Sequence, residues 1–117
     1  PGPRSVDMVP LSLGRHGERL ARRALRRAGY RVLAHNVRTP MGEVDMIAEE
    51  DGRLVLIEVK TSTRTAPRLL LRWRQRRRLE RSARWLAARS GRRIRRDLVE
   101  VSFDGRRPLV RIRRGRA

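Results

Sequence analysis

Cysteine is absent from this sequence of 117 residues. The chain therefore cannot form a disulfide framework, an iron–sulfur cluster, a cysteine-ligated zinc site or a thiol nucleophile. It also lacks any apolar run near the roughly 20 residues that span a bilayer, and it shows no signal-peptide pattern. We expect a soluble, cytoplasmic protein.

Aromatic residues are almost as scarce. The chain contains four of them, Tyr30, Trp73, Trp85 and Phe103. The core must therefore consist mainly of Leu, Val, Ile and Ala, and we expect both tryptophans in the core or in an interface. A protein that reads single strands by base stacking is disfavoured. The length indicates one domain, which we place at 14–117 after a flexible arm at 1–13.

Positive charge is the strongest property that the sequence does have. The chain carries 31 Lys and Arg against 12 Asp and Glu, a formal net charge of +19. Such a surface attracts polyanions, so nucleic acid is the first expected partner and an anionic membrane surface the second. A solvated basic surface, or a genome rich in Arg codons, explains the same charge without a partner. Every basic residue except Lys60 is arginine, and Lys has a compact ammonium whose pKa shifts more readily.

Residues 15–28 have apolar side chains at helical spacing and predict a helix. Its apolar stripe centres near Ala21, Ala24 and Ala28, and Glu18 lies at the edge of this stripe. Glu18 therefore does not lie on the far face of this helix, which the arginines cover.

Residues 68–89 predict a second helix. Leu79, Ala83 and Leu86 form a stripe on one face, with Trp73 in an earlier turn. Between and after the two helices, further segments have the composition of strands: 30–37, 43–49, 53–61, 97–103 and 108–113. The order helix, three strands, helix, two strands predicts an α/β fold around a mixed sheet.

The segments 43–49 and 53–61 form the most informative pair. Both alternate with period two, and Asp51-Gly52 between them predicts a two-residue hairpin of type I′. A loop of that length determines the register of the two strands. One face of the hairpin then carries the apolar residues Val44, Met46, Ala48, Val55, Ile57 and Val59.

The opposite face collects ionisable residues, with Asp45 opposite Glu58 and Glu43 opposite Lys60. Carboxylates in such positions have Cβ atoms about 4.5–5.5 Å apart and repel each other unless a cation lies between them. Mg²⁺ suits this arrangement because it binds one or two carboxylates and leaves room for water and phosphate. Lys60 projects from the same face and could orient or deprotonate the attacking water. Glu18 could reach this cluster from its helix.

Simpler interpretations of the same residues remain open. Glu43 and Lys60 could form an ordinary cross-strand ion pair, worth a few tenths of a kcal/mol. Asp45 and Glu58 could face solvent without a metal. The arginines of the second helix could likewise form a solvated face.

The motifs resemble those of the YraN-like proteins, uncharacterised protein family 0102. The match consists of Gly17-Glu18, Gly29-Tyr30, Asn36-Val37-Arg38, the block from Gly42 to Ala48, the block from Leu56 to Thr61, Gln75 among basic residues, and Asp97. It covers roughly residues 14–113, although the connection from Lys60 to Gln75 is shorter than is usual in that family. The family is similar to the PD-(D/E)XK nucleases and, among them, to archaeal Holliday-junction resolvases.

This resemblance implies a restriction-endonuclease-like three-layer fold, with a central mixed five-stranded sheet flanked by helices. It implies that Asp45, Glu58 and Lys60 form the active-site motif and that Glu18 is the helix carboxylate. It also suggests the Val59 carbonyl as a metal ligand and Gln75 as a supporting polar residue.

Together these observations predict a Mg²⁺- or Mn²⁺-dependent endonuclease acting on DNA rather than RNA, on branched or damaged structures, without membrane contact. Cutting two strands would suggest a homodimer. Phosphate contacts are expected from the second helix, through Arg72, Arg74, Gln75, Arg76, Arg77 and Arg78. The alternatives are a non-catalytic nucleic-acid-binding protein that keeps the fold and uses the carboxylates for a structural ion, and a basic RNA- or ribosome-associated module with an incidental acidic cluster.

Overall fold

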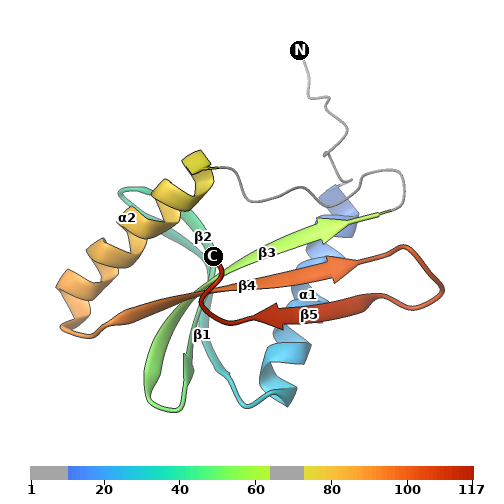
Figure 1. Ribbon diagram of the computed structural model, residues 1–117, viewed down its shortest axis with the longest axis horizontal. Coiled ribbons are helices and arrows are strands. Elements are labelled where there is room, and N and C mark those ends of the chain that lie inside the picture. The colour runs from blue at the N-terminus through green and yellow to red at the C-terminus, as the bar shows by residue number, and fades with distance from the viewer. Residues whose placement is uncertain (1–10, 64–72) are drawn as a thin grey trace.

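A five-stranded mixed sheet with two helices packed against it forms the protein (Figure 1). The computed structural model describes residues 11–63 and 73–117. Its elements are α1 (Leu11–Arg27), β1 (Arg31–Thr39), β2 (Gly42–Glu50), β3 (Arg53–Ser62), α2 (Trp73–Ser90), β4 (Ile94–Ser102) and β5 (Leu109–Arg113). The strands lie in the order β1-β2-β3-β4-β5, and β3 and β4 are parallel while the other neighbours are antiparallel. The predicted α/β fold with a mixed sheet is confirmed.

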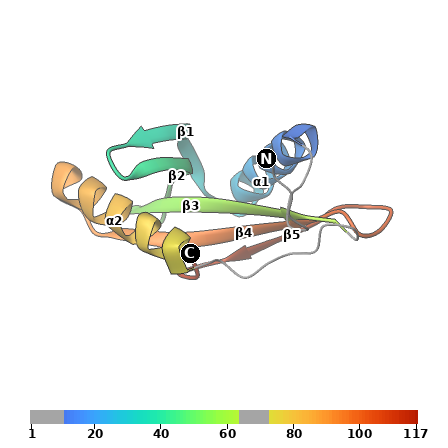
Figure 2. The ribbon, with the colours of Figure 1, turned by 90° about the horizontal axis from the view of Figure 1, so that it is seen from above.

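The two helices cover opposite faces of the sheet (Figure 2). Alternation along β3 explains this arrangement, because successive side chains point to opposite faces. Val55 and Ile57 pack in a buried cluster with Leu25 of α1, whereas Leu56 packs with Leu79 of α2. The sheet is therefore the middle of three layers.

Element boundaries differ from the prediction mainly at α1, which begins at Leu11, so residues 11–13 are helical rather than part of an arm. The other residues assigned to that arm, and residues 68–72 of the predicted second helix, lie outside the described residues. Neither described helix is long and apolar enough to cross a membrane.

Local turn chemistry agrees with the prediction. Asp51 and Gly52 both have positive φ, 50° and 77°, as a type I′ turn requires. The predicted register follows, from Glu50↔Arg53 to Met46↔Ile57.

Trp73 is 66% exposed, so of its two expected locations, the core and an interface, it does not occupy the core. Two predictions about burial are wrong. Val44 packs with Leu79 on the α2 face, not with Met46 on the α1 face. Ala28 is exposed, and the buried stripe of α1 runs through Gly17, Ala21 and Leu25. Trp85 is half-buried, with the Arg89 guanidinium 5.0 Å from its ring centroid.

Candidate active site

The site forms where β2 and β3 separate. The described pairing of the two strands stops at Met46↔Ile57, and the β1–β2 hairpin curls away from β3 (Figure 2). Beyond this point the Val59 N–H donates to Asp45 Oδ2 over 2.7 Å. The Asp45 side chain thus fills the opening between the strands, which a regular ladder would have closed.

Asp45 and Glu58 meet in this opening, although the backbone register does not extend to them. Glu58 is 7% exposed, and its protonated carboxyl donates a hydrogen bond to Asp45. Burial, and then the Asp45 charge, raises the pKa of Glu58 to about 8. Burial also raises the pKa of Asp45, against the hydrogen bond from Val59. The two carboxyls share a proton because nearby positive charge does not suffice to ionise both.

Lys60 lies beside this pair. Its Nζ is 3.8 Å from Glu58 Oε2, and its charge lowers the pKa of both Asp45 and Glu58. The predicted cross-strand pairing of Lys60 with Glu43 does not form in the described ladder, because β2 has already left β3 at that point. Glu43 is exposed, and its charge raises the pKa of Asp45.

Helix α1 brings a third carboxyl group to the same region. A Cβ atom on Gly17 would lie 2.4 Å from Thr61 Oγ1, so glycine permits the observed approach of α1 to the end of β3 while Thr61 keeps its position. The next residue, Glu18, is half-buried. Burial, and then the Asp45 charge, raises the pKa of Glu18. The predicted position of Glu18 at the edge of the buried stripe is consistent with this placement.

The donor set suits a hard divalent cation. Asp45 and Glu58 offer carboxylate oxygens, and their mutual repulsion would be relieved by a cation between them. In the described part of the chain, no three His, Asp or Glu side chains converge as a metal-ligating group. An ion would therefore take further ligands from water and substrate, which is the usual behaviour of Mg²⁺. The main chain of Val59, whose carbonyl was suggested as a metal ligand, lies next to this pair, because its N–H donates to Asp45.

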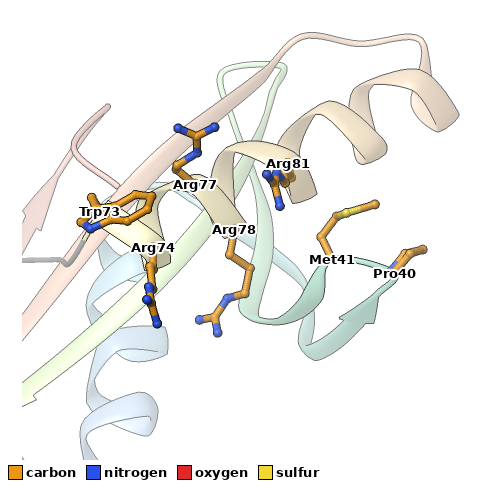
Figure 3. Close-up of a pocket in the computed structure, with 7 residues that line it drawn as sticks. All are labelled: Pro40, Met41, Trp73, Arg74, Arg77, Arg78 and Arg81. Atoms are coloured by element: carbon orange, nitrogen blue, oxygen red, sulfur yellow. The ribbon is translucent and has the colours of Figure 1, made fainter.

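A basic hollow of about 470 Å³ lies between α2 and the β1–β2 turn (Figure 3). We call it the arginine hollow. It is lined by Pro40, Met41, Trp73, Arg74, Arg77, Arg78 and Arg81. The Arg78 side chain passes over Gly42, where a Cβ atom would lie 2.7 Å from its Cδ, and its charge lowers the pKa of Glu58. Arg78 thus links the hollow electrostatically to the carboxylate pair.

The predicted phosphate-contacting residues divide into three groups. Arg74, Arg77 and Arg78 line the arginine hollow. Gln75 and Arg76 lie on α2 but do not line it, and the main-chain carbonyl of Arg76 accepts a hydrogen bond from Arg96. Arg72 lies outside the described residues. Sequence reasoning missed Arg81, although its helical spacing from Arg77 and Arg78 places it on the same side of α2.

Two motif residues, Tyr30 and Asp97, stabilise the fold and do not belong to the site. Asp97 is fully buried and accepts hydrogen bonds from Tyr30 Oη (2.7 Å), Arg95 Nε (2.8 Å) and the Gly115 amide (2.9 Å). These bonds join the start of β1, β4 and the segment after β5. Asp97 therefore has its acceptor capacity used for structure.

Known proteins match most of this chain. A relative from Desulfosudis oleivorans is 38% identical over 94 residues, 75% of this chain and 76% of that protein. One from Caulobacter sp. is 40% identical over 100 residues, which are 81% of this chain and 71% of that protein. One from Nocardia farcinica is 39% identical over 106 residues, which are 85% of this chain and 84% of that protein. All three are named UPF0102 protein. Residues 17–101, which include every site residue described above, match the model of uncharacterised protein family UPF0102, and the chain belongs to that family.

Proposed function

We propose that this protein is a Mg²⁺- or Mn²⁺-dependent endonuclease that hydrolyses phosphodiester bonds of DNA, on branched or damaged structures. The observation that carries the proposal is the pair formed by half-buried Asp45 and buried Glu58, with Lys60 3.8 Å from Glu58. The arginine hollow supplies positive charge on the same side of the sheet. The resemblance of the family to the PD-(D/E)XK nucleases supports the same assignment.

Each side chain has a separate task in this proposal. Asp45 and Glu58 hold the cation, and Lys60 orients the attacking water or balances charge that develops on the phosphate. Glu18 positions water from α1. When bound, the metal supplies Lewis-acid chemistry and lowers the pKa of water.

The arginines supply affinity without sequence readout. Arg74, Arg77 and Arg78 would contact backbone phosphates, which orient a nucleic acid but carry no base information. Specificity would then come from the shape of the substrate. Cutting both strands of a branched substrate would require two sites, and hence a homodimer.

Cleavage assays test the proposal. We would incubate the protein with labelled linear, flapped and four-way DNA, and with matching RNA, in Mg²⁺ or Mn²⁺. We expect cleavage that EDTA abolishes and that Glu58→Gln or Asp45→Asn lowers by about a hundredfold or more. Glu80→Gln, the same change on α2 outside the site, should leave the rate unchanged. Absence of cleavage on every substrate by folded protein would contradict the proposal.

A non-catalytic nucleic-acid-binding protein is the second candidate. The hydrogen bond between Glu58 and Asp45 favours it, because a pair that shares a proton is satisfied without a metal. In that case DNA would bind equally well with and without EDTA, Glu58→Gln would leave binding unchanged, and no substrate would be cut.

A further inference from the structure

The arginine hollow has a feature that phosphate binding alone does not require, namely an exposed indole. Trp73 is 66% exposed, although burying an aromatic ring would stabilise the fold. The guanidinium carbons of Arg74 and Arg77 lie 6.0 and 5.8 Å from its ring centroid, at the outer limit of a cation–π contact. An exposed aromatic ring with cations next to it is typical of sites where nucleic-acid bases stack.

The other end of the hollow is also partly apolar. Figure 3 shows Trp73 and Arg74 at one end, Pro40 and Met41 at the other, and Arg78 between them. Met41 is 39% exposed. The hollow therefore offers two apolar surfaces as well as charge.

Hydrogen bonds shape the β1–β2 turn and, through Thr39, connect it to α2. Thr39 Oγ1 donates to the Gly42 carbonyl over 2.8 Å and accepts from the Met41 amide over 3.0 Å. It also lies 3.2 Å from Ser82 Oγ on α2. Because these contacts fix Met41 relative to the helix, the hollow exists before a ligand arrives.

The occupant must match both the charge and the aromatic surface. Among the described residues that line it, none is acidic and four are arginines. A lipid headgroup or an acidic peptide offers negative charge but no flat ring, whereas a nucleotide offers a phosphate on each side of a planar base. Charge and shape together favour a nucleotide whose base is free to stack.

We propose that the arginine hollow binds an unpaired nucleotide, with its base stacked on Trp73 and its flanking phosphates paired with Arg74 and Arg77. Arg78 lines the hollow and also passes over Gly42 at the start of β2, the strand that carries Asp45, so this side chain would place the unpaired nucleotide on the catalytic side of the sheet. That position rests on the proposed function, and it narrows the substrate class to DNA with an unpaired nucleotide at a flap or branch.

Binding of labelled oligonucleotides, followed by fluorescence anisotropy, tests the proposal. The two probes are a short oligothymidylate and a chain of abasic sites with the same number of phosphates. We expect the wild type to bind oligothymidylate about tenfold more tightly than the abasic chain. Trp73→Leu should remove this preference, whereas Trp73→Phe, which keeps an aromatic face, should retain it. Thermal melting verifies that both variants fold.

Equal affinity of the wild type for the two probes would overturn the proposal, as would equal loss of the preference in both variants. Phosphatidylserine vesicles and the abasic chain are also compared as competitors of bound oligothymidylate. If the vesicles displace it more effectively than the abasic chain, the proposal is overturned in favour of a membrane surface. Cleavage of branched DNA is measured in parallel. Cleavage without base preference rejects this inference alone, whereas base preference without cleavage rejects the proposed nuclease alone.

Discussion

Glu58 illustrates how burial changes the chemistry of one side chain. In water its carboxyl would have a pKa near 4.5, and it would be ionised at neutral pH. In the folded protein it is 7% exposed and faces Asp45, so the pair retains a proton. A divalent cation would have to displace that proton, because carboxylate ligands bind metals in their ionised form.

Replacing Glu58 by Gln should therefore make the stability of the protein less dependent on pH. The folded state keeps the Glu58 proton up to a pH of about 8, whereas the unfolded chain loses it near 4.5. The wild type consequently loses stability as the pH rises through this window. We expect Glu58→Gln to raise the free energy of unfolding at high pH by on the order of 3 kcal/mol and to leave it unchanged near about pH 4. Urea denaturation at several pH values measures this, and an equal effect at both ends would contradict the assignment.

At the scale of elements, the approach of α1 to β3 determines where Glu18 lies. Gly17 allows this approach, since a Cβ atom there would meet Thr61 Oγ1 at 2.4 Å and Cγ2 at 3.3 Å. The Thr61 Cβ is farther away, at 3.4 Å, which is ordinary contact. The crowding thus comes from the two outer atoms of one side chain.

Gly17→Ala should destabilise the protein by roughly 1–3 kcal/mol through overpacking. In a Thr61→Ala background the same substitution should be neutral or stabilising, because Ala otherwise favours a helix over Gly by about 1 kcal/mol. Gly14→Ala on the same helix, with no atom within 4 Å of the added Cβ, is the matched control and should stabilise. A double-mutant cycle in urea measures the coupling. Equal effects in both backgrounds would show that Thr61 does not limit the approach of α1.

The elements were predictable from the sequence where local chemistry decides. Asp51 and Gly52 determine a turn and, through it, the register of β2 and β3. The divergence of those strands beyond Met46 has no such local signal. The exposure of Trp73 has none either, because its position one turn before the apolar stripe of α2 does not show whether the sheet covers it. The position of α1 is likewise determined by tertiary packing. Gly17, a glycine inside a helical pattern, is the signal in the sequence that indicates a close approach there.

At the scale of the whole molecule, buried acids are neutralised in two different ways. Glu50 accepts hydrogen bonds from Arg114 and Arg95, which hold its pKa at about 2. The Asp45–Glu58 pair instead keeps a proton. The net charge of +19 therefore lies mainly on the surface, and the arginine hollow concentrates part of it next to α2.

Nucleic-acid binding should accordingly weaken as the salt concentration rises. The contribution to this salt dependence should differ from one arginine to another. Arg81→Gln removes a charge from the arginine hollow, so the slope of log affinity against log salt should fall by about one unit. Arg26→Gln removes an exposed charge from the last turn of α1, outside this hollow, and should leave the slope unchanged. Anisotropy titrations of branched DNA at several salt concentrations measure both. Equal slopes for the two variants would indicate diffuse attraction by the whole surface.

The most direct test of the central claim is calorimetric titration of the protein with MgCl₂ at about pH 6 and about pH 9, with Asp45→Asn as the site variant and Glu80→Gln as the control. If Asp45 and Glu58 form a metal site, the wild type and the control bind Mg²⁺ more tightly at the higher pH and release protons at the lower one, while Asp45→Asn does not bind. Absence of Mg²⁺ binding at both pH values, or equal binding by Asp45→Asn, would contradict the claim and leave Asp45 and Glu58 as two carboxyls that only share a proton.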